Sequence, residues 1–205
     1  MVGKRQSIPN SSKKPALFVP VLPVRDAVHF PNLINTLHVV REASLRAVRR
    51  SMDGDRRVLV LSQNDMSLED PKAGDLFRVG TLSETLQAVP MPDASLRVAL
   101  RGLNRAQAVR IVSRSGAFWA EIQPLAETPA EGLDIDAMMR VAIEGFGRVV
   151  ALNKSIPPEA MQSVAHQEDA GRLADAIAHH LPIRFGVKQE LLETLDAKAR
   201  LRKIV

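Results

Sequence analysis

Apolar and polar residues alternate most clearly in the middle of the chain, between residues 76 and 112. In Ser95–Arg101 every second residue from Leu96 onward is apolar, which is the pattern of a strand with one buried face. Phe77–Val89 is also strand-like, and a third such run, Arg105–Arg114, follows Gly102. We therefore expect three antiparallel strands that are covered on one face.

Two features interrupt these strands. The apolar phase of the first run changes at Gly80, which predicts a β-bulge at that residue. The segment Pro90–Ala94 contains two prolines, each of which lacks a backbone donor and fixes φ. It therefore predicts a turn.

The preceding part of the chain predicts more strands and one helix. Leu17–Val24 is apolar but contains two prolines, so we expect an edge strand or two short pieces. Leu33–Val40 is strand-like, and the spacing in Ala43–Met52 predicts a helix. Val58–Leu61 is continuously apolar, which is typical of a strand buried on both faces.

The character of the chain changes after Ala117–Leu125, the last strand-like run. Residues 127–133 contain Pro and Gly among polar residues and predict a linker. Beyond it, the spacing of apolar residues predicts helices within 134–152, from 156, within 168–181 and 188–195, and after a capping Asp196. We therefore expect an α+β protein with a disordered tail (1–15), a β-rich domain (16–126) and a helical subdomain (134–205).

Composition excludes several classes of protein. The 205 residues are 45% hydrophobic and 25% charged, as in ordinary globular proteins. Cysteine is absent, which excludes a disulfide framework and suits a reducing compartment. No apolar run approaches the ~18 residues of a membrane span, and the start lacks the apolar core of a secretory signal. We expect a cytoplasmic protein without a membrane partner.

The net charge of +5 raises the question of nucleic-acid binding. Aromatic residues are only 3% of the chain and Tyr is absent, which leaves little for base stacking. We therefore favour solvated surface charge. The alternative is an RNA- or DNA-binding module whose phosphate contacts are Arg41, Arg46, Arg49, Arg50, Arg56 and Arg57.

Motifs for catalysis and cofactor binding are incomplete. Residues 74–81 are glycine-bounded like a phosphate loop, but lack its lysine and spacing. Ser163, His166 and Asp169 lie three residues apart, yet nothing in the sequence activates the serine or supplies an oxyanion hole. The five histidines show no metal-binding HExxH spacing. We predict that this chain alone is not an enzyme and holds no cofactor or metal.

Several segments together resemble the N-terminal domain of the Lon ATP-dependent proteases. VLPVRD at 21–26 with Phe30-Pro31 is similar to the family's LPLRD…FP, and DLFRVGT at 75–81 to its DLfxVGT. MPD at 91–93 with RGLNRA at 101–106 is similar to lPDGtxxvxveGlxRa. LNKSIPPE (152–159), LADAIAHHLP (173–182) and KQELLETLD (188–196) resemble its helical half. The likeness covers roughly residues 17 to 205.

This resemblance implies a PUA-like β-rich domain, built as an antiparallel sheet or pseudo-barrel with one helix, followed by an α-helical bundle. In the family, that bundle leads toward an AAA+ ATPase and a Ser–Lys protease. The sequence has neither the Walker lysine nor the protease module, so ATP and Mg would belong to the ATPase alone. We expect a piece of a longer, hexameric protein, monomeric or weakly dimeric by itself, with a stand-alone adaptor as the alternative.

The family's N-terminal region captures unfolded or degron-bearing proteins and helps the hexamer assemble. Such a role requires an exposed, shallow apolar patch that accepts many sequences. The candidate substrate-binding residues are Phe30, Pro31 and Leu33 after the first strand, and Met91 and Pro92 at the hairpin tip. Ordinary core packing is the alternative for Phe30 and Leu33.

The sequence departs from the family pattern at several positions. Ala94 replaces a usual Gly, so the hairpin turn must avoid a positive φ there or carry strain. Asn35 and Thr36 replace an apolar–Pro pair, Val40 replaces a Gly, and His38 stands where an aromatic residue is common. These changes fall in the first loop and strand. If that region binds substrate, its specificity will differ from that of relatives.

Overall fold

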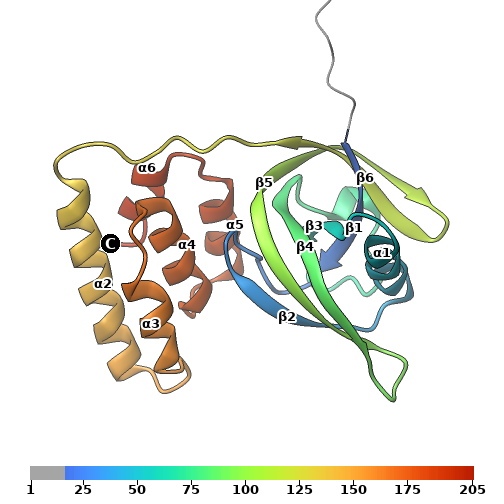
Figure 1. The fold of residues 1–205 in the computed structure, drawn as a ribbon, viewed down its shortest axis with the longest axis horizontal. Coiled ribbons are helices and arrows are strands. Elements are labelled where there is room, and N and C mark those ends of the chain that lie inside the picture. Colours follow the sequence, from blue (N-terminus) through green and yellow to red (C-terminus); the bar gives the residue numbers. More distant parts are fainter. Residues whose placement is uncertain (1–16) are drawn as a thin grey trace, which may run out of the picture.

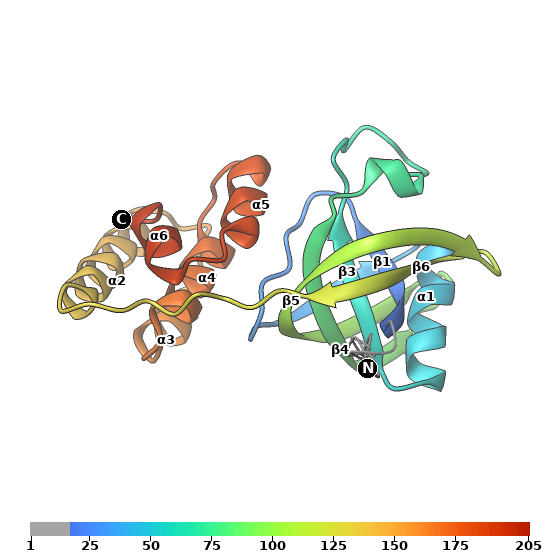
Figure 2. The same cartoon turned by 90° about the horizontal axis from the view of Figure 1, so that it is seen from above.

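The structure is a computed structural model that describes residues 17–205, so the predicted tail (1–15) lies outside the described residues. Figures 1 and 2 show a strand-rich half that includes α1 and a helical half, joined by an extended segment after β6. The strands are β1 (Leu17–Val24), β2 (Ile34–Val39), β3 (Arg57–Ser62), β4 (Val79–Pro90), β5 (Leu96–Arg114) and β6 (Ala117–Pro124). The helices are α1 (Glu42–Asp53), α2 (Ile135–Leu152), α3 (Glu159–Ala165), α4 (Ala170–His180), α5 (Phe185–Glu193) and α6 (Ala197–Arg202), with a 3₁₀ turn at Ala73–Asp75.

The strands form one sheet in the order β2-β5-β4-β3-β1-β6, and β5 also pairs with β6. This second pairing closes the sheet on itself, so that among the strands of residues 17–205 only β2 lies outside the ring, with β5 as its single neighbour. β1 and β3 are parallel, and every other pair is antiparallel. The three antiparallel strands expected from residues 76–112 correspond to β4 and to a β5 that continues, without a break at Gly102, through both later runs.

The prediction that Leu17–Val24 forms an edge strand or two short pieces is wrong, because these residues form one continuous strand, β1. β1 lies inside the sheet, between β3 and β6. Pro20 falls where β1 is in register with β6 alone, and Pro23 falls where it is in register with β3 alone. Each proline therefore lies where β1 has a neighbouring strand on one side only. Its missing N–H costs no hydrogen bond if it faces the side that has no strand.

The bulge predicted at Gly80 is also misplaced. The β4–β5 register is regular at Gly80 and shifts further along, between Leu82 and Ser83 and between Thr85 and Gln87. A Cβ atom at Gly80 would collide with the backbone carbonyl of Val60 on β3. The glycine therefore serves the close approach of two strands.

The turn between β4 and β5 carries backbone strain. Ala94, which replaces the glycine of the family pattern, has a φ of 65°. This value lies in the left-handed region, where the replacement was expected to cause strain. An L residue with a side chain loses roughly 1–2 kcal/mol in this conformation. The Met91 carbonyl accepts the Ala94 N–H and the Ser95 carbonyl accepts the Met91 N–H, and these bonds hold the turn in place.

Helices follow the sequence pattern closely. α1 matches the predicted helix, and the Asp196 side chain accepts the Ala199 N–H and so caps α6 as expected. Phe146, Leu173, Ile177 and Leu201 form the centre of the core between α2, α4 and α6. No helix within residues 17–205 has the length and apolar character needed to cross a bilayer.

The strand-rich and helical halves meet through an apolar contact and a buried ion network. Val28 and Phe30 pack against Ala178 of α4 and Leu191 and Leu192 of α5. The α5 residue Gln189 donates from Nε2 to the Val79 carbonyl of β4 at 3.0 Å. These contacts place α5 beside the sheet, as Figure 1 shows.

Four charged side chains form the ion network. Arg105 of β5 is 0% exposed and binds the Asp175 carboxylate of α4 through two hydrogen bonds of 2.9 and 2.7 Å. Its Nε donates to the Leu192 carbonyl at 2.7 Å, and its Nη1 donates to Glu127 at 2.8 Å. Arg200 of α6, also 0% exposed, contacts the same two carboxylates and donates to the Thr194 carbonyl.

This network has two positive and two negative charges, so the buried group is neutral overall. Burial lowers the pKa of Arg105, but hydrogen bonds and attraction from Asp175 and Glu127 outweigh it and raise that pKa. Because the four residues come from β5, the linker, α4 and α6, their charges can be satisfied only when the two halves are docked. The network therefore ties the arrangement of the halves to one geometry.

Removing one charge from this network is expected to destabilise the protein strongly. Asp175→Asn leaves Arg105 and Arg200 buried with one carboxylate fewer, and we expect the free energy of unfolding to fall by about 3 kcal/mol or more. Urea titration measures this change. Far-UV circular dichroism follows the helices, and fluorescence of Trp119 on β6 follows the sheet. In the variant, the unfolding transitions seen by these two signals should separate.

The matched control is Glu84→Gln, which removes the exposed partner of Arg101. We expect this change to cost less than about 1 kcal/mol, with coincident transitions. If Asp175→Asn cost no more than Glu84→Gln, the network would not hold the two halves together.

Candidate functional site

The structure buries two of the five sequence-predicted substrate-binding residues. Phe30 is 0% exposed and packs on α4 and α5, and Pro31 is buried as well. Leu33 is partly buried and contacts the apolar cores on the helical side. The expectation that Phe30 and Pro31 present a surface to substrate is therefore corrected, since both residues belong to the junction between the halves.

Met91 is partly buried and Pro92 is exposed at the turn between β4 and β5, as a hairpin tip requires. The two groups of candidates lie far apart. Ile34 pairs with Arg101 at one end of the β2–β5 ladder, beside Leu33, and Val39 pairs with Leu96 at the other end, beside the turn. A strand of this length spans roughly 17 Å, so the candidates do not form one patch.

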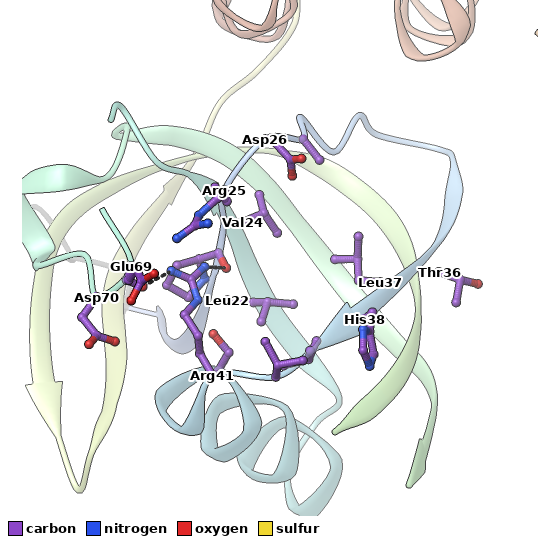
Figure 3. A pocket seen from close by; sticks show the side chains of 15 residues that line it. Leu22, Val24, Arg25, Asp26, Thr36, Leu37, His38, Arg41, Glu69 and Asp70 are labelled. Carbon is purple, nitrogen blue, oxygen red and sulfur yellow. Dashed lines mark hydrogen bonds between the residues drawn. The ribbon is translucent and has the colours of Figure 1, made fainter. Parts of the chain in front are cut away.

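β2 runs between these two groups and borders a hollow of about 570 Å³ (Figure 3). One wall consists of the end of β1 and the loop that follows it, and the other consists of β2 and the start of α1. Leu22 and Leu37 supply apolar surface from opposite walls. Val40 lies on the rim with 61% of its surface exposed.

A second hollow, of about 460 Å³, continues the first one toward the helices. The two hollows share Asp26, Ala27, Thr36 and Leu37, and the second ends at Phe185 and Lys188 of α5. Thr36 and Leu37 are successive residues of a strand, so their side chains point to opposite faces. Because both of them line both hollows, the depression follows the edge of β2. We call this combined depression the β2 groove.

Charged residues gather at the α1 end of the groove. Arg41 donates to the Gln63 side chain at 2.7 Å, to the Pro23 carbonyl at 2.9 Å and to the Glu69 carbonyl at 3.2 Å. Its pKa is lowered by burial and by the neighbouring Arg25. The guanidinium is thus bound to uncharged acceptors, as Figure 3 shows in part, and the Glu69 and Asp70 carboxylates make no ion pair with any residue from 17 to 205.

Two histidines lie at the other end. His29 is 4% exposed behind the groove, with the Asn35 side chain 2.7 Å from Nδ1 and no partner for Nε2 among the described residues. Burial, and to a lesser extent the charge of His179, lowers the pKa of His29 to about 4. Burial and then His180 and Lys188 lower the pKa of His179, which lines the groove, to about 4. Both are therefore neutral at pH 7.

The other patterns considered in the sequence do not converge on a site. The Ser163 hydroxyl lies 2.9 Å from His180, whereas Nδ1 of His166 contacts the Gln162 carbonyl and Asp169 caps α4. No group of metal-binding side chains gathers within residues 17–205.

The arginines proposed for phosphate contacts are partly engaged elsewhere. Arg41 is held in the groove as described, Arg46 pairs with Glu42, and Arg57 lies 3.7 Å from Asp55. Arg49 and Arg50 remain exposed on α1. These contacts give no specific support to the nucleic-acid alternative.

Sequence reasoning missed Thr36, Leu37 and Val40 as groove residues. The run Leu33–Val40 was predicted as a strand, but the pattern does not show which of its edges lacks a neighbour. One signal was present: Ile34–Val39 contains no charged residue and no proline, the two features that usually protect an edge strand.

Comparison with known proteins places this chain among Lon proteins. Residues 19–205 match the ATP-dependent protease La (LON) substrate-binding domain. The Lon protease of Erwinia amylovora is 35% identical over 96% of this chain, and that of Azorhizobium caulinodans is 38% identical over 91%. The chain spans only 25% and 22% of the lengths of these relatives.

Solved structures agree on the fold. The N-terminal domain of a Mycobacterium avium complex Lon protease superposes with a TM-score of 0.71 at 23% identity, covering 92% of this chain and 96% of that one. The Lon N-terminal domain protein from Xanthomonas campestris gives 0.63 at 18% identity, with 91% and 96% covered. The β-rich sheet with its helices is thus the fold of Lon N-terminal domains.

The buried histidines should make stability depend on pH. In the unfolded chain a histidine takes up its proton near pH 6.5, whereas folded His29 does so only near pH 4. Between these values the unfolded state binds more protons, so the contribution of His29 to stability is fully present above pH 6.5 and falls with decreasing pH. We expect His29 to contribute a slope of about 1.4 kcal/mol per pH unit, with His179 acting in the same direction.

Urea titrations at pH 7.5, 6.5 and 5.5 measure this slope, in a range above the ordinary titration of carboxylates. His29→Gln and His179→Gln should each flatten it. Because burial raises the pKa of Asp175 and this acts in the opposite direction, the comparison with the variants is decisive: a slope that neither substitution changes would contradict the neutral, buried state of these rings.

Proposed function

Because the chain belongs to the family of Lon substrate-binding domains, we propose that it captures unfolded or degron-bearing proteins for a Lon-type ATP-dependent serine protease. The chain itself performs no catalysis in this role. It supplies a binding surface, while ATP hydrolysis and peptide cleavage belong to other parts of the longer relatives.

The observation that carries the proposal is the open β2 groove. An unfolded client offers apolar residues and a free backbone in place of a fixed shape, so its receptor needs accessible apolar surface. The groove has partly buried Leu37 on its β2 wall and exposed Val40 (61%) on its rim, and Ile34 (64%) is exposed on the same strand beside the groove. Met91 and Pro92 lie at the turn beyond the Val39 end of β2. There a hydrogen bond of 2.6 Å between the His38 ring and the Ser95 hydroxyl joins β2 to the turn.

The organisation that suits this role has a PUA-like β domain at 16–126 for capture, a linker at 127–133 and a helical subdomain at 134–205 that leads toward an AAA+ module. The buried network between the halves supports the idea that the captured client is held at a fixed position relative to that module. We place the protein in the cytoplasm, as part of a hexamer.

A charge placed on the groove rim should weaken client binding. Val40→Asp replaces an exposed apolar side chain with one that must be desolvated against the client, and we expect about a tenfold loss of affinity for a reduced and alkylated model protein. Met91→Asp at the hairpin tip is expected to weaken binding by a smaller factor. Fluorescence anisotropy of the labelled client measures both changes.

The matched control is Val109→Asp, which alters a similarly exposed valine (57%) on β5 that does not line the groove. Its affinity should equal that of the wild type. Equal affinities for all three variants, each shown to be folded by circular dichroism, would remove the groove and the hairpin tip from the client-binding surface.

A further inference from the structure

We propose that the β2 groove binds its client as an added β-strand, through main-chain hydrogen bonds to the free edge of β2. This inference rests on the proposed function and specifies its chemistry. The occupant is an extended polypeptide segment of about six residues, matched to the length of β2, with apolar side chains at alternate positions and a basic residue near one end.

The register of β2 shows which of its backbone groups are free. The Gly102 N–H donates to the Leu33 carbonyl at 2.9 Å, so the odd-numbered residues of this strand form the ladder bonds to β5. In an antiparallel ladder alternate residues face away from the partner. The N–H and C=O groups of Ile34, Thr36 and His38 therefore point toward the groove.

Within the part of the chain that the structure describes, no other segment pairs with this edge. Among residues 17–205, no hydrogen bond outside the β2–β5 ladder involves a backbone group of Ile34–Val39. On the opposite wall, Pro23 has no N–H, and the carbonyls of Pro23 and Val24 already accept from Arg41 and from the Gln63 N–H. A polypeptide in the groove would consequently pair with β2 alone.

The chemistry of the edge fits such an occupant. Backbone groups recognise any extended polypeptide, which gives affinity without demanding one sequence. The apolar residues Leu22 and Leu37 lie where alternate side chains of the added strand would descend. At the α1 end, Arg25 and Arg41 donate to uncharged oxygen acceptors, so the exposed Glu69 and Asp70 carboxylates beside them keep the capacity to pair with a Lys or Arg of the client.

Thr36→Pro tests the main-chain contact from the side of the protein. Proline removes the Thr36 N–H that faces the groove and leaves the bonds to β5 intact, so the edge strand should still form. We expect the variant to keep its circular dichroism and to lose at least about tenfold affinity for a short peptide of alternating Val and Thr flanked by Lys. Thr36→Val, which keeps the N–H, should bind this peptide like the wild type.

N-methylation of the same peptide tests the contact from the side of the ligand. Methyl groups on one set of alternate amides should abolish binding, while methyl groups on the other set, which face away from β2, should leave it nearly unchanged. Isothermal titration calorimetry measures each peptide, and sedimentation velocity shows whether the protein stays monomeric.

The outcomes separate this inference from the proposed function. If both methylated peptides lost the same affinity, or if neither lost any, strand addition would be overturned. Client capture through side chains would remain possible in either case. If neither the unmodified peptide nor the alkylated model protein binds, the proposed function itself fails. Dimerisation abolished by Thr36→Pro, without peptide binding, would assign the β2 edge to a second copy of this chain and would also overturn the inference.

Discussion

The bidentate pair between Arg105 and Asp175 is the contact on which the arrangement of the molecule depends. It joins β5 to α4 through two buried side chains, and buried Arg200 with partly exposed Glu127 completes a neutral group of four charges. A buried charge without its partner would be prohibitively costly, so the two halves have one satisfied way to dock. The apolar packing around Phe30 then seals the same junction.

Docking the halves in this way determines which part of the sheet remains available. The ring closed by β5 and β6 leaves β2 outside with one neighbour, and α5 covers the sheet only as far as the end of the β2 groove. The rest of the groove is open between β1 and β2. The family pattern has a proline at the position of Thr36, so Thr36 provides a backbone donor on this edge that a proline would lack. The departures at Asn35, Thr36 and His38 all lie on β2, the proposed binding strand.

Much of the fold could be predicted from the sequence because local patterns determine it. The alternation in Ser95–Arg101, the spacing in Ala43–Met52 and the cap at Asp196 each report a nearby environment, and each was confirmed. The position of β1 inside the sheet and the burial of Phe30 could not be predicted in the same way. Both depend on contacts between residues far apart in the sequence, and the same holds for the site, since an edge becomes free only when the whole strand order is known.

Hydrogen–deuterium exchange of the intact chain, with and without a saturating unfolded polypeptide, tests the central claim most directly. If the buried junction holds the groove open for a client strand, exchange should slow in peptides that contain β2 and in the loop at residues 25–27. The helices α2, α3 and α6, which do not line the groove, should remain unchanged. Protection confined to α1 and the β5–β6 turn, where Arg50 and Arg114 border a separate hollow, or no protection at β2, would contradict the account.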